Sequence, residues 1–227
     1  MNLEIIHVGL LGTNCYITWD EEKNCVVVDC GGDAQKVAQF IQEKGLTPTH
    51  LLLTHGHGDH MGGAADLKEL YPQMKIVLDS KDLEMIGDGQ KSMSDAVAPY
   101  ARSFTPDVLV GDGDQLTCGK MEFTVLETPG HTPGSVTYLK NNELYCGDTL
   151  FQGSMGRTDL YGGNDEQMTA SLARLGSLQG YYKVFPGHGS ATNLEDEKLA
   201  NPFLKQDRKS TRLNSSHEIP SRMPSSA

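Results

Sequence analysis

Residues 54–63, with the sequence THGHGDHMGG, constrain this chain more than any other stretch. They contain four side chains that bind metals such as zinc, iron or manganese, namely His55, His57, Asp59 and His60. The apolar residues 51–53 before the stretch predict a buried strand, and residues 64–71 after it predict a helix. In the extended chain that leaves the strand, His55 and His57 point to the same side because side chains alternate. The pattern therefore predicts a metal site in the loop between a strand and a helix.

The glycines of this stretch agree with a metal site. Gly56 and Gly58 leave room for the backbone to bend around an ion, and Gly62 and Gly63 let the following helix start close to a sheet. The alternative is a surface turn that happens to be rich in His and Gly. Three histidines and an aspartate at this spacing favour the metal site.

Three later segments contain further ligand-type residues: His131 in TPGHTPGS, Asp148 in CGDTLF and His188 in FPGHG. Together with HGHGDH, these segments resemble the metallo-β-lactamase superfamily over about residues 3–203, and most of all its short, single-domain glyoxalase II-like hydrolases. LFQGSMGRTDL and the segment ATNLEDEKLANPFL strengthen that likeness. The resemblance implies two adjacent metal sites. The implied ligands are His55, His57 and His131 for the first ion, Asp59, His60 and His188 for the second, and Asp148 as the bridge between them.

The order of the expected elements predicts two halves that are alike, each β-rich, then a metal loop, then a helix. The expected strands are residues 3–8, 14–19 and 25–29 as an antiparallel meander, then 50–54, 76–78, 116–126, 136–140, 143–146 and 182–185. The expected helices are residues 33–44, 64–71, 82–86 and 165–175, with one helical turn at 94–100. This order predicts an α/β (α+β) fold of the metallo-β-lactamase type, a four-layer αβ/βα sandwich.

The composition changes abruptly at Asp207. Residues 207–227 are polar, rich in Ser and Arg, and have no periodic apolar face, which indicates disorder. The string DRKSTRLNSSH resembles the direct translation of a sequencing-library adapter, and SRMPSSA fits the continuation of that adapter. We therefore expect one domain, residues 1–206, followed by a non-native tail in which His217 is no metal ligand.

Composition and charge narrow the classes of function. The formal net charge of −11 argues against nucleic acid as a partner. The N-terminus has no secretory pattern, and no apolar run is long enough to span a membrane. Five scattered cysteines, without a CxxC pair, indicate reduced thiols and a cytoplasmic protein. Two of them, Cys30 and Cys146, are close in sequence to motif residues. They are either neighbours of the ligands or small buried fillers. The oligomeric state is not predicted.

Two cations that share a carboxylate lower the pKa of a bridging water from about 15.7 to near neutrality and polarise a carbonyl. We expect the resulting bridging hydroxide to cleave a thioester such as S-lactoylglutathione, since a thiolate with a pKa of about 8.5 leaves without a strong acid. The sequence offers no further obvious proton donor. Asp59 and Asp148 are the expected catalytic carboxylates, and the expected cofactor is two divalent ions, zinc in preference to iron or manganese.

Other functions stay open. The sulfur dioxygenases of the superfamily share this ligand set and a GRTD segment, but use one iron, which would be held by His55, His131 and Asp148. A hydrolase of another ester or a lactone, and a non-catalytic metal-binding domain, are further alternatives. Larger glyoxalase II enzymes grip glutathione with a C-terminal helical domain that this sequence does not show, which puts a preference for glutathione in doubt.

Several residues near the motifs have two interpretations. Arg157 either binds a substrate carboxylate or pairs with Asp159. Asp29 either orients a ligand or serves as a turn or helix-capping residue. The irregular segment 87–106 resembles the part of the family fold that covers the active-site mouth. Its residues Met93, Tyr100 and Phe104 therefore contact substrate or cover the core.

Overall fold

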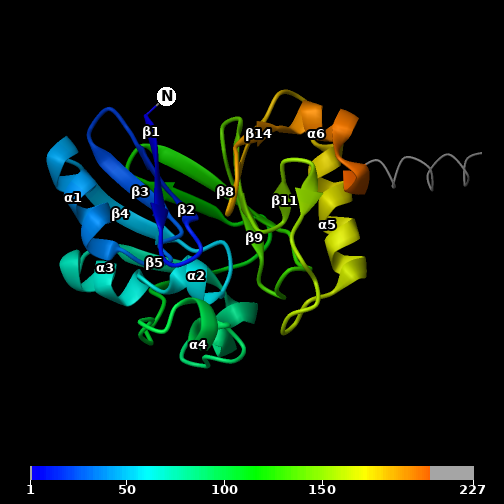
Figure 1. The fold of residues 1–227 in the computed structure, drawn as a ribbon. Helices are drawn as coiled ribbons and strands as arrows, with labels where there is room; N and C mark the ends of the chain where they lie inside the picture. The colour runs from blue at the N-terminus through cyan, green and yellow to red at the C-terminus, as the bar shows by residue number, and fades with distance from the viewer. Residues whose placement is uncertain (1, 205–227) are drawn as a thin grey trace, which may run out of the picture.

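The computed structural model describes residues 2–204. Two six-stranded sheets face each other, and helices lie on the outer face of each sheet (Figure 1). This arrangement confirms the predicted four-layer sandwich. The predicted non-native tail, residues 207–227, lies outside the described residues.

The first sheet has the strand order β1-β2-β3-β4-β5-β6. Its strands are β1 (Leu3–Val8), β2 (Thr13–Trp19), β3 (Asn24–Val28), β4 (Thr47–Leu52), β5 (Lys75–Asp79) and β6 (Val108–Val110). Strands β1 to β3 form the predicted antiparallel meander, and β3 to β6 pair in parallel. The parallel half places the carboxyl ends of β3, β4 and β5 at one edge of the sheet.

The second sheet has the order β14-β13-β10-β9-β8-β7. Its strands are β7 (Gln115–Cys118), β8 (Met121–Glu127), β9 (Val136–Lys140), β10 (Glu143–Gly147), β13 (Lys183–Pro186) and β14 (Thr192–Asn193). A small hairpin of β11 (Leu150–Phe151) and β12 (Ser154–Met155) follows β10. Because β10 and β13 pair in parallel, with Gly147 opposite Pro186, the loops that follow these two strands begin side by side.

The helices divide into two groups. Those on the outer faces are α1 (Ala34–Lys44) and α3 (Ala64–Leu70) on the first sheet, and α5 (Asp165–Ser177) and α6 (Leu194–Ala200) on the second. The short ones, which follow strands of the first sheet, are α2 (Gly58–Met61), the 3₁₀ helix η1 (Ser80–Met85) and α4 (Ser94–Val97). Helix α5 buries Met168, Leu172 and Leu175 as its periodicity predicts.

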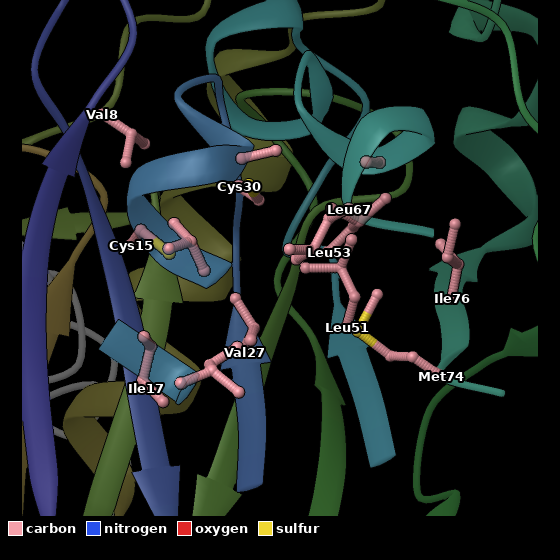
Figure 2. Close-up of a cluster of buried hydrophobic side chains, with 14 of the residues drawn as sticks. Val8, Cys15, Ile17, Val27, Cys30, Leu51, Leu53, Leu67, Met74 and Ile76 are labelled. Carbon is pink, nitrogen blue, oxygen red and sulfur yellow. The ribbon is translucent and has the colours of Figure 1, made fainter. Parts of the chain in front are cut away.

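Side-chain alternation divides the core into three layers. On β3, Val27 packs beneath helices α1 and α3, whereas Val26 and Val28 face the second sheet. Figure 2 shows the first of these layers, where Leu51 and Leu53 lie close to Leu67 of helix α3. The central layer contains the large aromatic side chains of both sheets, and the third layer lies between the second sheet and helices α5 and α6. Both sheets are therefore buried on two faces, which explains their nearly continuous apolar strands.

Several short elements differ from the sequence predictions. The helix predicted at residues 82–86 is the 3₁₀ helix η1, and the turn predicted at 94–100 is shortened to α4. Strands β6, β11, β12 and β14 and helices α2 and α6 were not predicted. Most of these contain two or three residues, too few to show a periodic pattern. Across residues 2–204, no helix is long and apolar enough to cross a bilayer.

Candidate metal centre

The ligand-type residues of the sequence motifs all follow the carboxyl ends of strands. The loop after β4 carries His55, His57, Asp59 and His60, and the loops after β8, β10 and β13 carry His131, Asp148 and His188. The structure brings these loops from both sheets together. Three groups, each with ligand atoms within 4.8 Å of one another, result: His55, His57 and His131; His55, His60 and Asp148; and Asp59, His60 and His188.

These groups overlap in a way that two adjacent ions require. Asp148 places Oδ1 3.3 Å from Nε2 of His60, and Oδ2 3.5 Å from Nε2 of His131. Its two carboxylate oxygens therefore face ligands assigned to different ions. His188 Nε2 lies 3.0 Å from Oδ2 of Asp59, which closes the second group.

Buried polar atoms without a hydrogen-bond partner test whether cations fit here. Among the described residues, four of the six such side-chain atoms belong to this cluster: Nε2 of His55, His57 and His60, and Oδ1 of Asp148. An unsatisfied buried polar atom costs about 1–3 kcal/mol. Coordination to divalent cations would satisfy Nε2 of His55 and His60 and Oδ1 of Asp148, whereas His57 would bind through Nδ1, the nitrogen that faces His131. A set of imidazoles and carboxylates suits zinc, iron or manganese. The residues fit the metals that the motifs imply.

The histidines carry their protons away from the centre. His131 donates from Nδ1 to the backbone oxygen of Arg157 (2.7 Å), and His60 donates from Nδ1 to Asp29 (2.8 Å). Both Nε2 atoms therefore face the centre, which is the orientation that binding to a cation requires. His57 Nδ1 and His131 Nε2 lie 2.9 Å apart, and two nitrogen atoms that close need a proton or a cation between them.

The electrostatics of the cluster favour metal-binding protonation states at His55, His57 and Asp148. At His60, burial lowers the pKa, but the carboxylates of Asp148 and Asp59 outweigh burial and raise it, so a cation would have to displace a proton there. Burial, with the neighbouring His131 next, lowers the pKa of His57 to about 3, and burial also lowers the pKa of His55. Both rings are therefore neutral at pH 7. Burial opposes charge on Asp148, but His60 and then His131 overcome it and hold the pKa of that carboxyl below its usual value. Asp148 therefore stays an anion.

Asp29 orients the ligands from below. Its carboxylate accepts hydrogen bonds from the backbone nitrogen and the hydroxyl of Thr54, both at 2.8 Å, and from Nδ1 of His60. The hydroxyl of Thr54 in turn lies 3.0 Å from Nδ1 of His55. The orienting role is therefore confirmed, and the helix-capping alternative is wrong because Asp33 occupies the cap of α1. Asp29 also has a positive φ of 56°, a strain typical of residues at functional sites.

Asp82, which the sequence did not single out, ties two ligand loops together. This fully buried carboxylate accepts hydrogen bonds from the backbone nitrogens of Gly56 (2.8 Å) and Gly134 (2.7 Å) and from the hydroxyl of Thr132 (2.7 Å). Gly56 stands between His55 and His57, and Thr132 follows His131. Asp82 therefore fixes the loop after β4 against the loop after β8. An aspartate in a short helix gives no sequence signal for such a role.

A glycine permits the close approach of the loop after β13. A side chain at Gly187 would collide with Oδ1 of Asp148 and with the ring of His60. The same residue donates its backbone hydrogen to the oxygen of Gly147 at 2.8 Å, and Asn14 bonds to the oxygen of Gly187 at the same distance. The motif PGHG therefore needs its first glycine to bring His188 to the centre.

A cavity of about 230 Å³ opens over the centre. Met93 lines it, which agrees with the predicted substrate contact. Tyr100 instead donates its hydroxyl to the oxygen of Gly31, and Phe104 packs against the first core layer, so these two cover the protein interior. Arg157 pairs with Asp159 at 2.6 and 2.8 Å, as the structural interpretation predicts. It also lines the cavity, and its binding of a substrate carboxylate stays a prediction.

Other residues near the motifs are structural. Cys30 and Cys146 belong to separate core layers, and their thiols contact backbone oxygens, so the side chains are buried fillers. The backbone nitrogen of Cys30 donates to the oxygen of His60 at 2.8 Å, so only its main chain contacts a ligand residue. The cavity also has lining residues that the sequence analysis missed, Leu11, Val97 and Leu160. Single apolar residues in loops give no signal that could have found them.

Comparison with known proteins agrees with this geometry. The family model for the metallo-beta-lactamase superfamily matches residues 8–188. Hydroxyacylglutathione hydrolase GloC of Haemophilus influenzae is 36% identical over 208 residues, which cover 90% of this chain and 98% of the relative.

Two solved structures extend the comparison. The BLEG-1 B3 metallo-beta-lactamase is 34% identical with a TM-score of 0.84, covering 89% of this chain and 99% of that one. TTHA1623 in a di-iron-bound form is 34% identical with a TM-score of 0.77, covering 88% and 100%. The fold, the assembled ligand cluster and these relatives lead to one conclusion: the chain belongs to the metallo-beta-lactamase superfamily.

Proposed function

We propose that this protein is a binuclear metal-dependent hydrolase that cleaves thioesters. The observation that carries the proposal is the pair of three-residue ligand groups with Asp148 between them. In this assignment His55, His57 and His131 would hold the first ion, Asp59, His60 and His188 would hold the second, and Asp148 would be shared by both. The glyoxalase II-like relative supports the reaction class.

Bound divalent cations would supply a hydroxide at neutral pH and polarise the carbonyl of the substrate. The chain's own residues supply the frame. Asp29 and the backbone oxygen of Arg157 hold the rings of His60 and His131 in one orientation, and Asp82 fixes the spacing of two ligand loops. Asp59 accepts hydrogen bonds from Thr13 (3.3 Å) and His188 (3.0 Å), so it is placed to pass a proton as well as to bind a cation.

The ease with which the leaving group departs favours a thioester over an amide as the substrate. Apart from the ligands, the residues that line the described cavity are Leu11, Met93, Val97, Leu160 and Arg157. A guanidinium does not give up its proton at neutral pH, so none of these five is an acid for a departing amine. The conjugate acid of a thiolate has a pKa of about 8.5, so a thiolate can leave without a proton donor.

The identity of the metal and the compartment are also part of the proposal. We assign zinc, with iron and manganese as alternatives, since imidazole and carboxylate ligands accept all three. TTHA1623 was solved with two iron ions, which supports two occupied sites and makes iron the strongest alternative. We place the protein in the cytoplasm because all five cysteines are free thiols. Its partner is a small thioester, with no nucleic acid or membrane bound.

The test is turnover by the full-length protein loaded with zinc, iron or manganese. We expect hydrolysis of thioesters, measured by release of free thiol, with two metal ions per chain by elemental analysis. A protein that holds one iron, consumes oxygen with glutathione persulfide and leaves thioesters intact would be the sulfur dioxygenase instead. Hydrolysis of lactones or oxygen esters alone would move the proposal to another hydrolase class.

A further inference from the structure

The cavity over the metal centre has a polar floor and an apolar rim. The floor consists of ligand residues, and the rim consists of Leu11, Met93, Val97 and Leu160 together with Arg157. These four apolar residues come from three separate segments: the loop between β1 and β2, the start and end of α4, and the loop before α5. An apolar lining on several sides is therefore built by the fold and not by one local sequence.

The rim segments are held in place although their side chains are partly exposed. Met93 has a positive φ of 60°, and its backbone oxygen accepts hydrogen bonds from the nitrogens of Ala96 and Val97, both at 3.0 Å. A left-handed conformation costs a non-glycine residue about 1–2 kcal/mol. Such strain persists where the surrounding structure fixes it, often at binding sites. Leu11, at the tip of the β1–β2 loop, remains 54% exposed.

The charge at the rim is already neutralised. Arg157 is the sole lysine or arginine among the cavity-lining residues in the described part of the chain. Both of its donor positions that face Asp159 are used, Nε to Oδ1 at 2.6 Å and Nη2 to Oδ2 at 2.8 Å. A substrate carboxylate would therefore share this guanidinium with an aspartate attached two residues away, which weakens its attraction for an anion.

We infer that this rim selects an uncharged thioester with an apolar substituent in preference to a thioester of glutathione. This inference rests on the proposed function. Glutathione carries carboxylates at both of its ends, and the one cationic side chain among the described rim residues, Arg157, is already paired with Asp159. An apolar substituent would instead bury its surface against Leu11, Met93, Val97 and Leu160.

The experiment compares two thioesters of acetic acid, one with glutathione and one with the uncharged benzyl mercaptan. On the full-length, metal-loaded protein, we expect kcat/KM to be at least about tenfold higher for the benzyl thioester. Leu11→Ser should lower kcat/KM for the benzyl thioester about fivefold, through KM, and change the glutathione thioester less than about twofold. The matched control is Leu10→Ser, a neighbour that is 66% exposed and outside the cavity lining. It should change neither substrate.

A second variant tests the neutralised charge. Asp159→Asn frees Arg157 and should raise kcat/KM for the glutathione thioester about threefold, the size of one exposed ion pair, without a gain for the benzyl thioester. Wild-type preference for the glutathione thioester, or equal effects of Leu11→Ser and Leu10→Ser, would overturn the inference and leave the proposed function standing. If the metal-loaded protein hydrolysed neither thioester, the proposed function itself would fall, and this inference with it.

Discussion

The floor and the rim of the cavity differ in how strongly each side chain is held. Beneath the floor, Asp29 and Asp82 each accept three hydrogen bonds and fix the ligand loops. On the rim, Leu11 is half-exposed and Arg157 pairs with a neighbouring exposed aspartate. A fixed floor suits chemistry that depends on cation geometry. The rim side chains are partly exposed and can be replaced without disturbing that geometry, so the rim is the part of the site where selectivity for the substrate can vary.

The largest expected effect comes from removing the carboxylate shared by both ligand groups. Asp148→Ala should lower kcat/KM by about 10³-fold or more and reduce the metal bound per chain, because both groups lose a ligand. Elemental analysis after gel filtration and a thiol-release assay measure the two effects. The control is Asp159→Asn on the rim, which should keep its full metal content. Unchanged turnover in Asp148→Ala would contradict the proposed role of the floor.

A smaller effect is expected at Asp82, which contacts no cation itself. Asp82→Asn replaces an acceptor by a donor that faces other donors, so the loops after β4 and β8 lose their fixed spacing. We expect metal affinity to fall about 10–100-fold and the free energy of unfolding to fall by about 1–3 kcal/mol. Competition with a chromophoric chelator and urea unfolding measure these quantities.

Two further measurements separate positioning by Asp82 from general destabilisation. Glu84→Gln, on the same 3₁₀ helix but exposed, should change stability by less than about 0.5 kcal/mol and leave metal affinity intact. The visible absorption of the cobalt-substituted protein reports ligand geometry and should change in Asp82→Asn at temperatures where the variant is fully folded. An unchanged cobalt spectrum would make Asp82 a residue of the fold alone.

The smallest expected effect concerns a buried carboxylate that accepts fewer hydrogen bonds than Asp29 and Asp82 do. Asp79 accepts one hydrogen bond, from the nitrogen of Lys81, and its Oδ2 has no partner among the described residues. Burial raises its pKa to about 6. Because the folded-state pKa exceeds the unfolded value of about 3.9, the stability linked to protonated Asp79 is present below pH 4 and is lost as the pH rises through 6.

Asp79→Asn removes that buried charge. The variant should be more stable than the wild type by about 1 kcal/mol at pH 8, and the difference should shrink steadily from pH 6 to pH 4. Urea unfolding of both proteins across this range measures it. A constant difference at every pH would show that the pKa of Asp79 is the same in the folded and the unfolded protein, and would contradict the raised pKa.

The sequence predicted the ligand residues of the floor because they lie in short motifs that follow apolar strands. HGHGDH concentrates four ligand-type residues in six positions, and the apolar strands before each loop are readable by their composition. The expectation that His131, Asp148 and His188 lie close to this motif came from the family resemblance. The physical cause of this proximity is the parallel pairing of β10 with β13 and the facing of the two sheets. These are tertiary features that no local pattern contains.

The sequence did not reveal the rim or the support beneath the floor. Asp82 acts through Gly56 and Gly134, which are 26 and 52 residues away along the chain. Leu11 and Leu160 are ordinary loop residues whose role depends on what packs beside them. Asp29 was noticed, but its two interpretations could be separated only when its contacts with Thr54 and His60 were known.

The most direct test of the account is a metal titration of the metal-free, full-length protein, with thioester hydrolysis followed at each addition. We predict that activity rises until two equivalents of divalent cation are bound per chain and then stays constant. Full activity at a single equivalent, with no second ion retained, would contradict the two-ion centre on which the proposed function depends.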